Sequence, residues 1–149
     1  MSISNYLVII PTYNEKENIG QMIEHIFSLS LPLDILIVDD NSPDETSTII
    51  STYQKTHKES LFLLKRPSKQ GLGTAYTDGF KWAVERNYSS IITMDCDFSN
   101  DPNDLKRFID IFNKDESIDL IIGSRYIGGI RILNWPLNRL LLSKAASIY

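Results

Sequence analysis

The sequence predicts an α/β fold in which an open, mostly parallel sheet carries helices on both faces. Two observations support this prediction. Short apolar runs alternate along the chain with longer stretches of helical periodicity, as in repeated strand–helix units. Most of these runs are continuously apolar, as expected of strands that are covered on both faces. The 149 residues are the size of one ordinary domain, so we expect a single domain over residues 1–149.

Five apolar runs are expected to be strands, and four stretches with helical spacing lie between them. In the first of these stretches, Ile19, Ile23, Ile26 and Phe27 form one apolar stripe that would face the sheet. The expected strands are residues 6–10, 35–38, 61–64, 91–94 and 120–122, and the expected helices are residues 15–29, 46–56, 74–86 and 102–112.

Polar residues mark where three of the helices should begin. Asn14 and Asp44 are candidate N-caps of the first and second helices. Pro102 directly after Asp101 fits a proline in the first turn behind an aspartate cap. These residues also offer a plain structural explanation for some of the motifs considered below.

The bulk composition narrows the class of protein. The net charge of −4 argues against a nucleic-acid partner, because such proteins usually carry a basic patch or stripe. A single cysteine excludes an internal disulfide framework. We find no secretory signal at the N-terminus and no apolar run near the roughly 20 residues that span a bilayer. The oligomeric state is not indicated.

The most informative motif is the pair Asp95 and Asp97, which follows the apolar run 91–94. Carboxylates two positions apart at the end of a strand can turn toward one site. Two hard oxygen ligands, with water and substrate phosphates completing the shell, suit Mg²⁺ or Mn²⁺. The alternative is a polar loop in which Asp101 and Asp104 cap the next helix. Cys96 lies between the two aspartates, and we interpret it as a small residue whose side chain faces away from theirs.

The end of the first strand carries the polar segment 11–18. Tyr13 could lie against a purine or pyrimidine ring, and Glu15 could accept hydrogen bonds from a base or ribose. The alternative is that Asn14 caps the first helix while Glu15 and Glu17 favour its dipole. Both interpretations can hold together, since a residue near a cap can also face a ligand.

Two further strand ends carry polar or glycine-rich segments. In residues 38–46, Asp39 and Asp40 follow the second strand, where an acid suits base or ribose recognition. The alternative there is a turn capped by Asp44. Residues 69–74 are glycine-rich before a helix, which indicates either a phosphate loop or a tight turn.

The last part of the chain has an amphipathic pattern. Leu137, Leu141, Lys144 and Ile148 would share one helical face, with Arg139 on another. The chain then stops at Tyr149 within this pattern and without a cap, so we expect it to be truncated at its C-terminus.

Five blocks occur together and in order, and the combination resembles the family 2 glycosyltransferases of GT-A fold. Within them it is most similar to the polyprenyl-phosphate mannosyltransferases, the dolichol-phosphate mannose synthases. The resemblance implies a Rossmann-like GT-A domain that transfers mannose from GDP-mannose to a polyprenyl phosphate, dolichyl or undecaprenyl, with inversion. The blocks are residues 11–15, 38–44, 71–76, 94–97 and 123–126.

The resemblance also implies roles for individual residues. The nucleotide-sugar donor would be held by Pro11, Tyr13, Glu15, Val38, Asp39, Asp40, Asp95, Cys96 and Asp97. The metal, Mg²⁺ or Mn²⁺, would be held by Asp95, Asp97 and Ser99, and relatives often have Gln at the position of Ser99. Asp97 and Arg125 would be catalytic, and Arg125, Arg139 and Ser143 would bind the acceptor phosphate.

The chemistry agrees with this resemblance. A phosphate monoester is mostly dianionic at neutral pH and can attack the anomeric carbon without a general base. The resemblance places the enzyme on the cytoplasmic side of a membrane, with residues 130–149 as the start of an acceptor-binding, membrane-proximal segment. Two alternatives remain open. One is a UDP-sugar-dependent member of the same family, and the other is a nucleotide-sugar-binding module without catalysis.

Overall fold

The computed structural model describes residues 5–115 and 117–123 of the chain. By their contacts the residues form two compact units, Met1–Asp115 and Glu116–Tyr149, and the described fold belongs to the first. Within the described residues, no helix is long and apolar enough to cross a membrane.

The first unit is built on a four-stranded parallel sheet. The strands are β1 (Tyr6–Thr12), β2 (Leu33–Asp39), β3 (Leu61–Lys65) and β4 (Ser90–Thr93), in the order β3-β2-β1-β4. All three neighbouring pairs are parallel. The α/β class and the parallel sheet predicted from the sequence are therefore confirmed.

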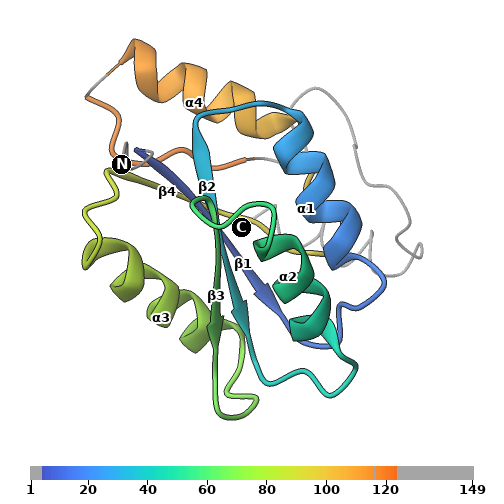
Figure 1. Cartoon of the computed structure of the whole chain (residues 1–149). Coiled ribbons are helices and arrows are strands. Elements are labelled where there is room, and N and C mark those ends of the chain that lie inside the picture. Colours follow the sequence, from blue (N-terminus) through green and yellow to red (C-terminus); the bar gives the residue numbers. More distant parts are fainter. Residues whose placement is uncertain (1–4, 116, 124–149) are drawn as a thin grey trace, which may run out of the picture. The chain divides into compact units, whose positions relative to one another are not determined.

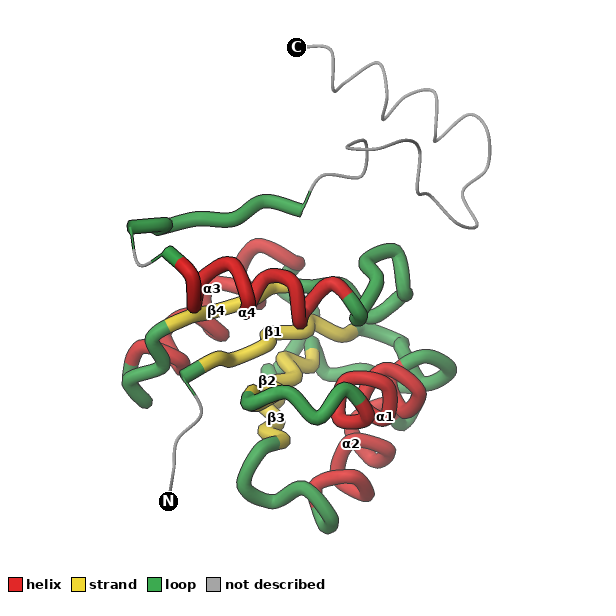
Figure 2. The backbone as a smooth tube through the Cα atoms, turned by 90° about the horizontal axis from the view of Figure 1, so that it is seen from above, coloured by secondary structure: helices red, strands yellow, loops and turns green. Residues whose placement is uncertain are grey.

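Helices cover both faces of this sheet (Figure 1). Alternate residues of β1 point to opposite sides, so that Val8 packs with α1, α2 and α4 while Ile9 packs with α3. Figure 2 shows the strands between these helices, seen from above. The helices are α1 (Ile19–Ser28), α2 (Thr46–Gln54), α3 (Leu72–Val84) and α4 (Asp104–Lys114).

Burial on both faces explains the continuous apolar runs in the sequence. Leu7, Val8, Ile9 and Ile10 are all fully buried. A strand with helices on both sides has no solvent-exposed face, so polar and apolar residues do not alternate along it.

Two of the expected helix caps differ from the structure, and the third helix begins at Leu72 instead of residue 74. We expected the first helix from residue 15 with Asn14 as its cap, but α1 begins at Ile19. Asn14 lies instead in the left-handed region with φ 60°, a conformation that asparagine tolerates better than most residues. The expected Asp101 cap was also misplaced, because α4 begins at Asp104 and Asp101 accepts a 2.9 Å hydrogen bond from the amide of Asn103 in the preceding turn.

The second helix starts close to where the sequence placed it. Asp44 Oδ1 accepts a hydrogen bond from the amide of Thr46, the first residue of α2, over 3.1 Å. Glu45 between them has φ 70°, which turns the chain into the helix.

The fifth expected strand was wrong. Residues 120–122 form no strand in the structure, and Leu120 and Ile122 are 74% and 79% exposed. A run of three apolar residues is too short to specify a strand by itself, because a strand also needs a paired neighbour.

Candidate functional site

The order of the strands defines where a ligand would bind. The sheet runs β3-β2-β1 in one direction and then continues with β4 on the other side of β1. In open α/β sheets the crevice at such a reversal, outside the carboxyl ends of the strands, is the usual ligand site. The polar segment from Tyr13 to Glu15 follows β1, and Asp95 and Asp97 follow β4. The fold therefore brings two of the sequence motifs to the same end of the sheet.

Both aspartates after β4 are oriented by hydrogen bonds. Tyr76 of α3 donates from its hydroxyl to Asp95 Oδ1 over 3.2 Å. The backbone amide of Asp95 donates to Asn100 Oδ1 over 3.0 Å. The amide of Ser99 donates to Asp97 Oδ1, also over 3.0 Å. Asp97 is exposed and Asp95 is partly buried, so the pair can be reached from solvent while its orientation is restrained.

Cys96 points the other way. It is 2% exposed and packs in the core between the sheet and α1. Burial raises the pKa of its thiol well above the usual range, and the nearby charges of Glu15, Asp97 and Asp95 raise it further. This confirms that the side chain faces away from the two aspartates, so only its backbone can meet a ligand. Glu15 follows β1 and the aspartate pair follows the neighbouring strand β4, so these residues lie at the same end of the sheet.

The donor atoms available fit a hard divalent cation. Asp95 and Asp97 offer carboxylate oxygens, which Mg²⁺ and Mn²⁺ prefer. Among the described residues, no three His, Cys, Asp or Glu side chains converge into a complete metal cage. The protein would therefore supply two carboxylates and leave positions for water and phosphate oxygens, which is the usual arrangement where Mg²⁺ binds a nucleotide.

The loop after β1 is hydrogen-bonded to the loop after β2 and to the first residue of α2. The amide of Asn14 donates to Ser42 Oγ and the amide of Glu15 to Thr46 Oγ1, each over 3.1 Å. Asn18 donates from its side chain to Glu15 Oε2 over 2.8 Å. Tyr13 is 36% exposed, so its ring remains accessible to a base. The backbone of this loop and the carboxylate of Glu15 are thus held in place.

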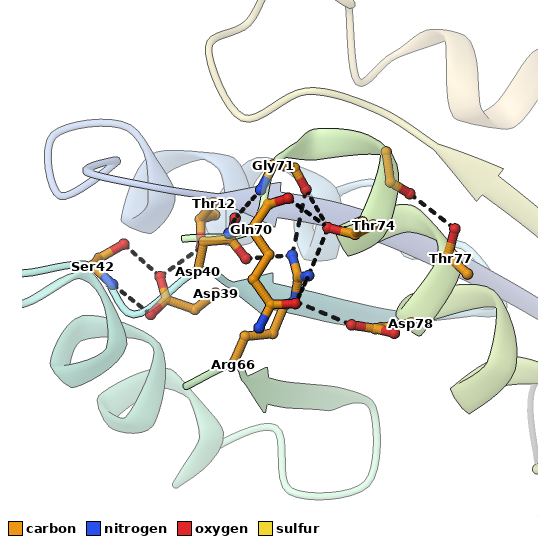
Figure 3. Close-up of polar contacts among 11 residues, drawn as sticks. Thr12, Asp39, Asp40, Ser42, Arg66, Gln70, Gly71, Thr74, Thr77 and Asp78 are labelled. Carbon is orange, nitrogen blue, oxygen red and sulfur yellow. Dashed lines mark hydrogen bonds and ion pairs between the residues drawn. The ribbon is translucent and has the colours of Figure 1, made fainter. Parts of the chain in front are cut away.

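Asp39 is fully buried and satisfied within the protein (Figure 3). Thr12, Ser42 and Ser47 donate hydroxyl hydrogen bonds to its carboxylate over 2.9, 2.5 and 3.0 Å. The amide of Ser42 adds a fourth bond over 3.0 Å. In this structure Asp39 therefore holds the loop after β2, and its role toward a nucleoside stays a prediction.

The other predicted donor residues of β1 and β2 contribute differently. Asp40 is 5% exposed and pairs with Arg66, a residue to which the sequence analysis gave no role. Val38 is fully buried in the core beneath α3, so only its backbone can contact a donor. Pro11 is partly buried and lies opposite Val38 in the register of β1 and β2.

Three predicted site residues, Arg125, Arg139 and Ser143, lie outside the described residues, as does the segment 130–149. Tyr76 and Arg66, in turn, were not predicted from the sequence. Tyr76 lies in one of the five blocks, but no spacing rule links it to Asp95, which is 19 positions away. Arg66 and Asp40 are 26 positions apart and meet only because β2 and β3 are adjacent.

A parallel sheet covered by helices on both faces, with an accessible carboxylate pair at its switch point, defines an α/β protein of GT-A-like fold. The chain belongs to the glycosyl transferase family 2, whose model matches residues 7–147.

Two curated relatives match this chain over nearly its whole length. It is 43% identical to the polyprenol monophosphomannose synthase of Mycolicibacterium smegmatis, over 96% of this chain and 53% of that protein. It is 39% identical to the undecaprenyl-phosphate mannosyltransferase of Micrococcus luteus, over 96% of this chain and 57% of that protein. The chain thus spans about half the length of the curated relatives it matches.

Solved structures agree with the fold. A mannosyltransferase from Pyrobaculum calidifontis, in complex with GDP-Man and Mn²⁺, is 25% identical with a TM-score of 0.51, over 56% of this chain and 25% of that one. Residues 1–349 of S. aureus TarS match with a TM-score of 0.62 at 20% identity, over 81% of this chain and 39% of that one. At that identity the second match shows the fold alone.

Proposed function

We propose that this protein is an inverting glycosyltransferase that moves mannose from GDP-mannose to the phosphate of a polyprenol. The observation that carries the proposal is the meeting of two strand ends at the switch point. One brings Tyr13 and Glu15, which suit a nucleoside, and the other brings Asp95 and Asp97, which suit a metal-bound diphosphate. The names of the two curated relatives and the GDP-Man complex of the Pyrobaculum calidifontis enzyme support the donor and the acceptor class.

The described residues would bind and orient the donor. Tyr13 would lie against the base, and Glu15 would accept hydrogen bonds from the base or ribose. Mg²⁺ or Mn²⁺ would be held by Asp95 and Asp97, with Ser99 nearby, and when bound it would neutralise charge that develops on the leaving diphosphate. The hydrogen bonds from Tyr76 and from the amide of Ser99 would keep the two carboxylates in place for this task.

The acceptor phosphate would be its own nucleophile. As a dianion it needs no protein base, so the chain's contribution is to position two anionic groups and offset their charge. Arg125, Arg139 and Ser143 are proposed to bind that phosphate, and Arg125 and Asp97 to act at the reacting centre. A polyprenyl phosphate resides in a membrane, and we propose that the protein works at the cytoplasmic membrane surface with residues 130–149 close to it.

A calorimetric titration tests the donor site. We expect GDP to bind more tightly with Mn²⁺ than without it, and more tightly than UDP. Asp97→Ala should weaken GDP binding at least about tenfold, or about 1.4 kcal/mol, when Mn²⁺ is present, and much less when it is absent. Asp110→Ala is the matched control, because Asp110 forms a surface ion pair with Lys106 on α4.

Two results would contradict the proposal. Equal losses with and without Mn²⁺ would make the aspartate pair structural. A preference for UDP of about tenfold would reassign the donor to a UDP-sugar.

A further inference from the structure

We propose that Lys69 is a further donor-binding residue, which contacts the diphosphate and is held beside Tyr13 by a buried cluster around Arg66. The inference rests on the proposed function for the identity of the ligand. Lys69 begins the segment 69–74, which the sequence marks as either a phosphate loop or a tight turn, but no role was predicted for its side chain. No role was predicted for Arg66 either.

Lys69 lies beside Tyr13, one of the candidate nucleoside contacts. Its Nζ stands 3.8 Å from the centroid of the Tyr13 ring, in the geometry of a cation–π contact. Both side chains reach solvent. In the described part of the chain, no carboxylate lies within ion-pair distance of Lys69. An exposed cation–π contact is weak, so the ammonium can turn toward an arriving anion at little cost.

The negative charge at this end of the sheet is the reason why a diphosphate would need Lys69. Glu15, Asp95 and Asp97 are carboxylates beside which an anionic nucleotide would have to bind. Two nearby cations are already engaged: Lys16 pairs with Glu45 over 2.7 Å, and Arg66 is only 4% exposed. A divalent ion offsets part of the repulsion, and Lys69 would supply a further positive charge that a diphosphate can reach.

A buried cluster fixes the segment that carries Lys69 (Figure 3). Arg66 Nη1 lies 2.5 Å from Asp40 Oδ1, at the end of β2. Its Nη2 donates to Thr74 Oγ1 over 2.6 Å and to Gln70 Oε1 over 3.0 Å. Its Nε lies 3.1 Å from Asp78 Oδ2, an ion pair outside hydrogen-bond geometry. One guanidinium thus joins β2, the loop after β3 and the first two turns of α3.

The other oxygen of Asp40 holds the loop backbone. Asp40 Oδ2 accepts hydrogen bonds from the amides of Gln70 and Gly71 over 3.2 and 3.3 Å. Gly71 has φ 95°, a conformation that side-chain-bearing residues rarely adopt. Because Gln70 directly follows Lys69, these bonds determine where the lysine leaves the loop. The cluster therefore fixes the path of the loop next to the Tyr13 ring.

The presence of an arginine at position 66 indicates a role in positioning the loop, and not in stability alone. A buried ion pair often adds little to stability compared with apolar residues of similar size. What the planar guanidinium adds is a set of donors at fixed angles, which lysine cannot reproduce. Arg66 uses them to reach three separate segments at once. We therefore assign Arg66 as a positioning residue that acts through Lys69.

The first experiment measures the contact itself. Lys69→Met should weaken GDP binding about tenfold in the presence of Mn²⁺, as loss of a charge-assisted contact predicts. Guanosine, which has no phosphate, should compete equally well for the wild type and the variant. Lys58→Met is the matched control, because Lys58 is exposed just before β3, at the opposite end of that strand from the Lys69 loop. An affinity for GDP within about twofold of wild type, or an equal loss for guanosine, would overturn the proposal.

The second experiment tests the role of the cluster by a double-mutant cycle. Arg66→Lys keeps a positive charge beside Asp40 and loses the fork to Gln70 and Thr74. Thr74→Val removes one partner of that fork, together with the bonds from the threonine hydroxyl to the carbonyls of Gln70 and Gly71, and serves if Arg66→Lys does not fold. In either background Lys69→Met should cost GDP affinity less than about threefold instead of about tenfold. An unchanged tenfold cost would show that the cluster does not position Lys69.

The wild-type titration separates this inference from the proposed function. If the wild type binds neither GDP nor UDP, the donor site and the inference both fail. If it binds one of them and Lys69→Met is neutral, only the inference fails.

Discussion

The hydroxyl of Tyr76 donates a hydrogen bond to Asp95 Oδ1 over 3.2 Å, so the second turn of α3 holds a carboxylate that follows β4. Burial raises the pKa of Tyr76 far above its usual range, and the charge of Asp95 raises it further. The phenol therefore keeps its proton and remains a donor throughout the neutral and mildly alkaline range. A group that never ionises there is suited to orienting a metal ligand and unsuited to proton transfer.

Tyr76→Phe should lower the affinity for Mn²⁺, measured in the presence of GDP, by about tenfold. Loss of a hydrogen bond that orients a metal-binding carboxylate typically costs this much or more. The matched control is Tyr53→Phe, which removes a 2.5 Å bond to Glu24 between α1 and α2. If both variants bind Mn²⁺ equally well, Tyr76 has no influence on the metal site.

Tyr76 and Tyr88 should make the stability of the fold decrease at alkaline pH. The hydroxyl of Tyr88 donates a hydrogen bond to Asp34 Oδ2 over 2.7 Å. Burial raises the pKa of Tyr88, and the hydrogen bond to Asp34 raises it further. Burial likewise raises the pKa of Tyr76. Above about pH 10 an unfolded chain loses its phenolic protons while the folded chain keeps these two. The unfolded state is then favoured, and the contribution of both groups to stability falls as the pH rises toward their raised pKa values.

The measurement is the urea midpoint at about pH 8 and about pH 10.5. The wild type should lose stability between the two values, and the double variant Tyr76→Phe, Tyr88→Phe should lose clearly less. The same slope in both proteins would mean that other groups cause the alkaline loss.

Arg66 and Asp40 should be strongly coupled in stability. Arg66→Met leaves a buried carboxylate without its partner and should cost about 3–5 kcal/mol of unfolding free energy. In the double variant Asp40→Asn, Arg66→Met no unpaired charge remains, so its loss should be smaller than the sum of the two single losses. Urea unfolding of the four proteins measures this coupling, and additive losses would contradict it.

The sheet could be predicted from the sequence because strands that are buried on both faces appear as continuous apolar runs. Ile9 and Ile37 lie in strands covered on both faces, and their neighbours along the chain are apolar as well. The aspartate pair was also recognisable, since a strand end and two carboxylates are consecutive in the sequence. The start of α1 was missed because Asn14 adopts a left-handed conformation that a capping pattern does not reveal.

The supporting contacts of the site could not be predicted in this way. Arg66 comes directly after an apolar strand, where a charged residue is usually exposed, yet it is buried by partners from three segments. Tyr76 meets Asp95 only because α3 and β4 are brought together by the fold. Such contacts depend on tertiary packing, and a single sequence carries no period or spacing that marks them.

Gly79 allows α3 to approach the sheet, and Gly79→Ala should destabilise the fold. A Cβ at this position would lie 2.9 Å from Ile9 Cγ2 and 3.1 Å from Ile9 Cδ1, with Val38 Cγ2 at 3.5 Å. Both neighbours are fully buried, so neither can move without disturbing the core. We expect a loss of about 1–3 kcal/mol in the free energy of unfolding, as for other overpacked cores.

Gly73→Ala is the control, because it makes the same change in the same helix with the opposite expected result. A Cβ at Gly73 has no heavy atom within 4 Å, and the residue lies in the first turn of α3. Alanine is the better helix former, so this variant should match the wild type or gain up to about 1 kcal/mol. Urea unfolding compares the two variants directly. If Gly79→Ala were as stable as Gly73→Ala, close contact between α3 and β1 would not explain the glycine at position 79.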